Sequence, residues 1–154
     1  MDELKQKAYI FATIFTLANK LQMAGYEFDK NITTKQWLFV LGAANFSDPP
    51  MISEIAAFLG YSRQNAKRIA SDLQKSGFIK LSRDQNDARV LRVELTPKSA
   101  AYFKERDKRE IEFLESIFKG FGSDLTNGLY EGIVRLESNL KKLMMAENSN
   151  IESD

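Results

Sequence analysis

A very short interval between two helical patterns restricts how this chain can fold. The first pattern begins at Ser53 and ends at Gly60, and the second begins at Ser62; the hydroxyl of each serine is suited to cap its helix. Two helices joined by only about three residues must cross each other instead of lying side by side. The second helix ends at Gly77, and the apolar spacing then changes from helical to alternating. This order predicts a helix, a tight turn, a second helix and a β-hairpin.

Apolar periodicity predicts further helices on both sides of this region. Residues 4–25 carry two apolar stripes, which predicts a helix that is buried on two sides and ends at Gly25. Thr33 or Thr34 can cap the helix that ends near Asn45, and Thr96-Pro97 signals the start of a later helix. The expected helices cover residues 4–25, 33–45, 53–60, 62–77, 96–118 and 124–146, and the expected strands cover 78–81 and 89–95. The expected fold is mainly α with a small β-hairpin wing, a winged helix-turn-helix flanked by long helices.

The composition excludes several kinds of chemistry. The 154 residues include no cysteine and no histidine, so a disulfide, a Cys/His zinc site and a histidine-based catalytic triad are impossible. No run of about 18 apolar residues is present. The acidic start, Met1-Asp2-Glu3, lacks the basic region of a secretory signal, so we expect a cytoplasmic protein with no membrane partner.

The acidic side chains do not indicate an enzyme. Four of them, Glu105, Asp107, Glu110 and Glu112, alternate with lysines and arginines on one expected helix, which is typical of solvated ion pairs. The sequence has no glycine-rich phosphate loop and no cluster with metal-ligand spacing. We therefore expect no catalytic residue, no metal and no cofactor.

The charges are unevenly distributed along the chain. The net charge is only +1, from 22 basic and 21 acidic residues, but residues 61–83 contain six basic residues and one acidic residue. In the expected helix 62–77, alanine, isoleucine and leucine form one stripe, and arginine, lysine, glutamine and asparagine lie off it. Such polar side chains read guanine and adenine edges in the major groove of DNA. A solvated helix face, or a winged helix that binds an acidic protein partner without specific DNA readout, is the alternative.

Several short motifs of this region occur together in one known family. They are Ile52–Ala56, Ser62–Ile69, Leu73–Ile79, Asp87-Ala88-Arg89 and Val93–Thr96. Residues 33–96, which contain them, resemble the MarR family of bacterial winged-helix transcription regulators. The resemblance implies a DNA-binding transcriptional regulator that binds a pseudo-palindromic duplex as a homodimer. Many members of the family repress by occupying a promoter and some activate, so a repressor is expected and an activator is the alternative. Residues 33–96 would then be the DNA-binding domain, residues 1–32 and 97–146 the dimerisation region, and residues 147–154 a frayed tail.

The resemblance also implies which residues touch DNA. The helix that enters the groove would be lined by Ser62, Arg63, Gln64, Asn65, Lys67 and Arg68. Gln64 and Asn65, near its start, are the residues we expect at base edges. Arg89 would enter the minor groove from the wing and Asp87 would hold it by an ion pair, although hairpin-turn chemistry is an alternative role for Asp87. Lys80 and Arg83 would contact phosphates.

Family members often bind small aromatic or anionic compounds in a cleft between the dimerisation helices and the winged helix, and others sense oxidants through cysteine. The second mode is excluded here because the chain has no cysteine. The aromatic residues on helices that can line such a cleft are Tyr9, Phe11, Phe15 and Trp37. An ordinary core position is the alternative for each, since aromatic side chains at helical spacing usually pack inside the protein.

Overall fold

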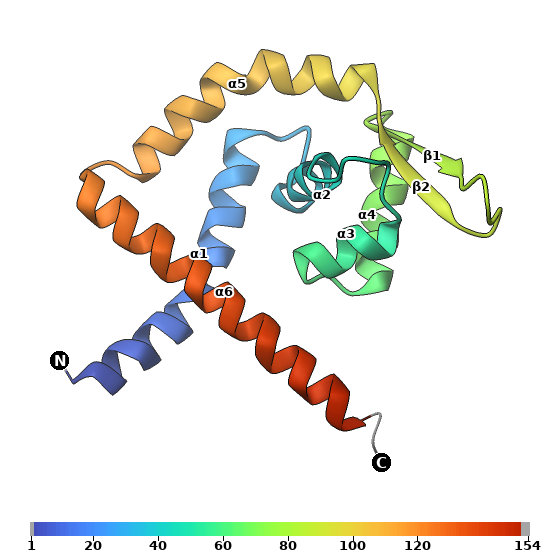
Figure 1. Ribbon diagram of the computed structural model, residues 1–154. Helices are drawn as coiled ribbons and strands as arrows, with labels where there is room; N and C mark the ends of the chain where they lie inside the picture. The colour runs from blue at the N-terminus through green and yellow to red at the C-terminus, as the bar shows by residue number, and fades with distance from the viewer. Residues whose placement is uncertain (1, 152–154) are drawn as a thin grey trace. The chain divides into compact units, whose positions relative to one another are not determined.

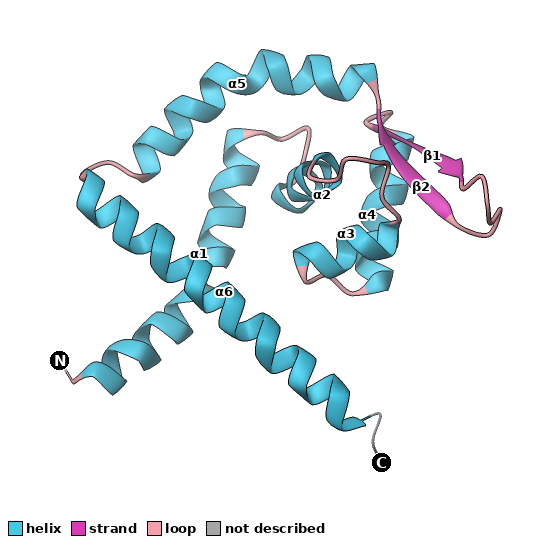
Figure 2. Ribbon diagram, viewed as in Figure 1, coloured by secondary structure: helices cyan, strands magenta, loops and turns pink. Residues whose placement is uncertain are grey.

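The computed structural model describes residues 2–151, and it describes side chains as far as residue 146. This part of the chain forms helices and one two-stranded antiparallel sheet (Figures 1 and 2). The elements are α1 (Glu3–Phe28), α2 (Thr34–Ala44), α3 (Ile52–Leu59), α4 (Arg63–Lys75), β1 (Ile79–Arg83), β2 (Leu91–Leu95), α5 (Pro97–Ile117) and α6 (Ser123–Ile151). The mainly α fold with a β-hairpin wing is confirmed.

The chain forms two compact units, Met1–Arg109 and Glu110–Asp154. The first unit contains α1 to α4, the hairpin and the first half of α5, and the second contains the end of α5 and α6. Side chains of the first half of α5 pack on the winged helix. The division into a DNA-binding domain (33–96) and a dimerisation region (1–32 and 97–146) stays a prediction.

The core of the first unit lies between the central helices and the hairpin. Phe39 of α2, Ile55 of α3, Leu73 of α4 and Val93 of β2 are all buried. Tyr102 of α5 packs against this core and is half-buried. Burial of apolar surface in this cluster is the main force that holds the three helices and the hairpin together.

The start of α2 is closed by a reciprocal pair of hydrogen bonds. The Thr33 hydroxyl accepts from the backbone N–H of Gln36 at 3.2 Å, and the Gln36 side chain accepts from the backbone N–H of Thr33 at 2.9 Å. This capping box satisfies two backbone donors that the helix leaves unpaired. Thr33 is therefore the cap, and Thr34 instead donates to the carbonyl of Gln22 on α1.

The expected stop of the first helix at Gly25 is wrong, because α1 continues to Phe28. Gly25 has a different role. A Cβ atom at this position would overlap the side-chain hydroxyl of Thr34. The glycine thus allows the last turns of α1 to approach the start of α2 without an intervening side chain.

Three other expectations differ from the structure. Ser53 does not cap α3; Met51 precedes the helix, and its backbone N–H donates to the Glu54 carboxylate at 2.6 Å. α1 has no buried residue, so the burial expected on two sides does not occur within one chain. α6 continues past residue 146 to Ile151, into the expected frayed tail, since no glycine or proline follows Gly132. Residues 152–154 of that tail lie outside the described residues.

The hairpin is held to the segment that precedes α3. Its strands pair antiparallel from Ile79 opposite Leu95 to Arg83 opposite Leu91. The backbone N–H of Val93 donates to the Pro50 carbonyl at 2.8 Å, and Met51 forms a single bridge to Arg92. The wing is therefore connected by backbone hydrogen bonds to the helix-turn-helix as well as by the chain itself.

A buried carboxylate connects the loop after α1 to α5. Asp29 is 7% exposed and accepts hydrogen bonds from the Tyr102 hydroxyl, from Nη1 of Arg106 at 2.8 Å and from the backbone N–H of Asn31 at 3.0 Å. Burial raises the pKa of Asp29, but the hydrogen bonds from Tyr102 and Asn31 and the charge of Arg106 outweigh it and lower the pKa below 3.8. Asp29 is therefore ionised at neutral pH, and its partner Arg106 also lies 5.0 Å from the centre of the Phe28 ring.

We predict that Asp29→Asn lowers the free energy of unfolding by about 3 kcal/mol, because the buried pair with Arg106 loses its negative charge. The folded-state pKa of Asp29 is lowered, so its charge stabilises the fold above the unfolded pKa near 3.8, and this contribution is lost as the pH falls through the folded pKa. In urea unfolding at a fixed protein concentration, the free energy of unfolding of the wild type should therefore exceed that of Asp29→Asn by a constant amount near neutral pH. This difference should shrink below about pH 4.

Asp48→Asn is the matched control, because Asp48 is exposed. We expect it to change the free energy of unfolding by less than about 0.5 kcal/mol. Equal effects of the two substitutions would contradict the structural role of Asp29.

Candidate nucleic-acid interface

The turn between α3 and α4 fixes the helix that carries most of the predicted contact residues. Gly60 ends α3 with φ +69°, in the left-handed region, and the backbone N–H of Tyr61 donates to the Ala56 carbonyl at 2.8 Å. The Ser62 hydroxyl then accepts from the backbone N–H of Asn65 at 3.2 Å and starts α4. The predicted end at Gly60 and the predicted cap at Ser62 are both confirmed.

The two sides of α4 differ in burial. Ala66, Ile69, Ala70 and Leu73 are buried against the core, and the small alanines let α4 approach it closely. The predicted contact residues lie off this stripe, where Ser62, Arg63, Gln64, Lys67 and Arg68 are exposed and Asn65 is half-buried. The structure therefore brings all six together on the solvent side of one helix.

Two of these residues are hydrogen-bonded to each other. Nη2 of Arg68 donates to Oδ1 of Asn65 at 3.3 Å. The amide oxygen of Asn65 therefore accepts one hydrogen bond in the free protein, and the Gln64 side chain is exposed one position earlier on the helix. An amide oxygen can accept two hydrogen bonds, so Asn65 can also bind a ligand while Arg68 stays in place.

The hairpin carries the remaining predicted contact residues. Lys80 on β1 and Arg83 at its end are exposed. Nη1 of Arg83 donates to the Ala88 carbonyl at 2.8 Å, across the loop that joins the strands. In Figure 1 this loop is the part of the hairpin farthest from α2, α3 and α4.

Asp87 holds Arg89 by two parallel hydrogen bonds. Nε of Arg89 donates to Oδ1 and Nη2 donates to Oδ2, each at 3.0 Å. The backbone N–H of Arg89 also donates to Oδ1, so the expected ion pair and the alternative turn chemistry are both present. The hydrogen bond from Arg89 lowers the pKa of Asp87 and raises the pKa of Arg89. The Arg89 side chain is 91% exposed, so the pair orients the guanidinium without covering it.

Sequence reasoning missed two residues that organise the wing, Asp84 and Arg92. Oδ1 of Asp84 accepts from the backbone N–H groups of Asn86 and Asp87 at 2.8 and 3.1 Å, and Oδ2 accepts from Nε of Arg92 at 2.7 Å. The hydrogen bond from Arg92 is the main cause of the lowered pKa of Asp84. An aspartate two residues before Asn86 is a local turn signal and could have been found. Arg92 reaches Glu54, far away in sequence, so it carries no local signal.

The four aromatic residues predicted for a ligand cleft occupy two different environments. Tyr9, Phe11 and Phe15 are exposed on α1, and the rings of Phe11 and Phe15 meet edge to face at 5.3 Å. Trp37 packs against the core, as the alternative expected, and its ring centre lies 5.9 Å from the Arg106 guanidinium. Their role in binding a ligand stays a prediction.

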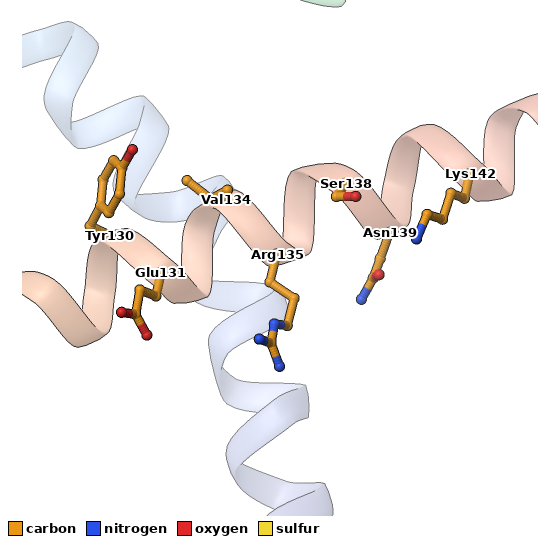
Figure 3. A pocket seen from close by; sticks show the side chains of 7 residues that line it. All are labelled: Tyr130, Glu131, Val134, Arg135, Ser138, Asn139 and Lys142. Atoms are coloured by element: carbon orange, nitrogen blue, oxygen red, sulfur yellow. The ribbon is translucent and has the colours of Figure 1, made fainter.

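Two hollows of the surface are lined by other residues. One of about 380 Å³ lies where α1, α2 and α4 meet, and it is lined by Gln22, Tyr26, Thr33, Thr34, Lys35, Gln36, Arg68, Ile69 and Asp72. The other follows α6 alone, and Figure 3 shows that all seven of its side chains project from that helix. A hollow lined by a single helix is an open groove that encloses nothing.

Other kinds of site find no support in the part of the chain that the structure describes. Among residues 2–151 no three acidic side chains are grouped so that they could hold a metal ion. No helix within the same range has the length and apolar character needed to cross a membrane.

Residues 32–90 match the MarR family. A segment of 53 residues is 43% identical to the transcriptional repressor MprA of Escherichia coli strain K12. This segment of the chain is similar to the MarR family. The match to MprA covers 34% of this chain and only 30% of that relative, which is less than a third of its length.

Solved structures of MarR-type regulators share this fold. The MarR/EmrR family transcriptional regulator from Acinetobacter sp. ADP1 has a TM-score of 0.76 with 19% identity, over 88% of this chain and 97% of the other. An organohalide-sensing regulator, RdhR-CbdbA1625 in its 2,4-dichlorophenol-bound form, has a TM-score of 0.75 with 13% identity, over 90% and 85%. At such identities the likeness shows the fold.

We predict that Gly60→Ala lowers the free energy of unfolding by about 1 kcal/mol, because an L-residue is strained in the left-handed region. No atom lies within 4 Å of a Cβ built at this position, so the cost comes from the backbone alone. Gly60→Asn is the matched variant and should cost less, since asparagine tolerates this conformation. Urea unfolding of the three proteins measures the difference, and equal losses for alanine and asparagine would contradict a backbone origin.

Proposed function

We propose that this protein is a transcriptional regulator of the MarR family, a repressor, that binds a pseudo-palindromic DNA duplex as a homodimer. One observation carries the proposal. The exposed side of α4 presents Arg63, Gln64, Lys67 and Arg68, and the adjacent hairpin presents Arg89. Arginine, glutamine and asparagine side chains on a helix that fits the major groove can distinguish guanine and adenine edges.

The residues of α4 would divide between two tasks. Gln64 and Asn65 lie in the first turn, the part of such a helix that reaches base edges most directly. Ser62 and Arg63 lie at the same end, and Lys67 and Arg68 one turn later, where they can meet bases or phosphates. Phosphate contacts would supply most of the affinity, and base contacts would supply the sequence preference.

The wing would contact the duplex beside the helix. Arg89 is exposed and held by Asp87, which suits a guanidinium that enters a narrow minor groove. Lys80 and Arg83 are exposed on the same hairpin and would meet phosphates. The near-zero net charge of the whole chain does not oppose this role, because residues 61–83 contain six basic residues and only one acidic residue.

The apolar surface of the long helices supports a homodimer. α1 has no buried residue, and large apolar side chains such as Phe11 and Phe15 are at least 60% exposed. α6 by itself exposes the stripe Leu125, Leu129, Ile133, Leu136, Leu140 and Leu143. Monomeric proteins rarely expose apolar patches of this size. A two-fold dimer would also place two copies of α4 about one helical turn of DNA apart, roughly 34–36 Å.

A small aromatic or anionic compound is proposed as the signal that releases the DNA. One regulator of this fold is described as organohalide-sensing and has 2,4-dichlorophenol bound. Tyr9, Phe11 and Phe15 are exposed on α1, and Trp37 lies on α2, so aromatic side chains are available for such a compound. We propose a cytoplasmic protein that needs no cofactor and has no enzymatic activity.

Selection of binding sites from random DNA duplexes tests the whole proposal. The expected result is a pseudo-palindrome whose half-sites lie about 10 base pairs apart. Salt-sensitive binding without enrichment of any sequence would instead favour a winged helix that uses its basic face for protein contacts.

We predict that Arg89→Ala weakens binding to all duplexes about tenfold and reduces the salt slope of binding by about one, because one groove charge is removed. Fluorescence anisotropy over a series of salt concentrations measures both quantities. Lys104→Ala removes the same charge from exposed α5 and is the control, with unchanged affinity expected. Unchanged affinity of Arg89→Ala at moderate salt would remove the wing from the interface.

We predict that light scattering at micromolar concentration gives twice the mass of one chain, and that Leu136→Glu gives a monomer. A carboxylate in the apolar stripe would have to be buried without a partner. Ser138→Glu introduces the same charge on the polar side of α6, where Figure 3 places Ser138 between Arg135 and Lys142, and should leave the dimer intact. A monomeric wild-type protein would contradict the two-half-site arrangement.

A further inference from the structure

Arg92 joins the wing to the helix-turn-helix through its side chain. Its Nε donates to Oδ2 of Asp84 at 2.7 Å, and its Nη1 lies 3.5 Å from Oε2 of Glu54 and 3.4 Å from the Pro49 carbonyl oxygen. Asp84 belongs to the loop of the wing, whereas Pro49 lies in the segment before α3 and Glu54 lies in the first turn of α3. One guanidinium therefore contacts both the wing and the first helix of the helix-turn-helix.

The contacts continue from Arg92 to the end of the wing. Asp84 binds Nε of Arg92 with one carboxylate oxygen and the backbone N–H groups of Asn86 and Asp87 with the other. The carboxylate of Asp87 in turn binds the guanidinium of Arg89. An unbroken series of hydrogen bonds thus runs from the start of α3 through Arg92, Asp84 and Asp87 to Arg89.

Exposure distinguishes the two arginines of this series. The Arg89 side chain is 91% exposed, whereas those of Arg92 and Asp84 are 32% and 15% exposed. Nε and Nη1 of Arg92 face protein acceptors on two sides. Arg89 is thus placed to meet a ligand, and Arg92 is placed to hold the protein together.

We propose that Arg92 and Asp84 are positioning residues that set the place of Arg89 relative to α4, without touching DNA themselves. The proposal rests on the DNA-binding function proposed above and adds residues to which that function assigns no role. A hairpin loop without this support would sample many conformations, and Arg89 would lose binding energy in being ordered at the groove. The forked guanidinium is required, because a lysine ammonium cannot reach Asp84 and the start of α3 with the same geometry.

Two substitutions separate positioning from simple electrostatics. Arg92→Lys keeps the positive charge, so a role in attracting phosphates predicts nearly unchanged affinity. Asp84→Asn removes a negative charge, so electrostatics alone predicts tighter binding to DNA. Positioning predicts that both variants bind the selected duplex more weakly, by about tenfold if the contribution of Arg89 is largely lost. Unchanged affinity for Arg92→Lys together with tighter binding for Asp84→Asn would overturn the proposal.

A double-mutant cycle tests whether Arg92 acts through Arg89. In the Arg89→Ala background, Arg92→Lys should weaken binding by less than about twofold, because the residue that it positions is already absent. Lys80→Met is the control, because Lys80 makes none of the hydrogen bonds in this series. In the double variant its fold-loss of DNA affinity should multiply with the fold-loss caused by Arg89→Ala. If the fold-losses of affinity of Arg92→Lys and Arg89→Ala multiply in the double variant, Arg92 acts independently of Arg89, which would contradict the proposal.

Hydrogen exchange in the absence of DNA measures directly how strongly Arg92 restrains the loop of the wing. The amides of Asn86 and Asp87 should exchange about tenfold faster in Arg92→Lys than in the wild type, while amides of α2 keep their rates. This comparison also shows whether the variant is folded. If the wild type bound no duplex, the proposed function would fail, and the exchange rates would still decide whether Arg92 holds the wing loop. Equal rates in the two proteins would contradict that hold.

Discussion

The buried charge of Asp29 is the interaction on which the arrangement of the first unit depends. A carboxylate with so little exposure is stable only if its oxygens are fully hydrogen-bonded, and Tyr102 and Arg106 of α5 and the backbone of Asn31 provide those bonds. The loop between α1 and α2 can therefore lie in only one place relative to α5. Since α5 follows directly from β2, the same contact fixes the exit of the hairpin.

Local signals predicted much of this fold. The caps at Thr33 and Ser62 and the end at Gly60 depend on residues within a few positions of each other, and so does the pair of Asp87 and Arg89. Each of these features is a property of a short peptide, so the sequence displays it directly. The placement of the six predicted contact residues on one side of α4 likewise follows from helical periodicity.

The features that escaped prediction depend on residues far apart in sequence. Asp29 meets Arg106 across 77 positions, and Arg92 meets Glu54 across 38, so neither pair has a spacing that could be recognised. The predicted helix end at Gly25 is wrong for the same reason. Gly25 contacts Thr34 only because α1 packs on α2, and in the sequence alone a glycine near the end of a helical pattern indicates that the helix ends there.

The hydrogen bond between Arg68 and Asn65 bears on how such a protein would search along DNA. In the free chain the Asn65 amide oxygen accepts one hydrogen bond from Arg68, and the exposed side of α4 offers the positive charges of Arg63, Lys67 and Arg68 to any duplex that it meets. Contacts between such charges and phosphates are insensitive to base sequence and allow sliding. Because an amide oxygen can accept two hydrogen bonds, Asn65 could accept one from an adenine while Arg68 stays bound to it. Arg68 would then serve both tasks, since its charge attracts the duplex and its hydrogen bond holds the Asn65 amide in place.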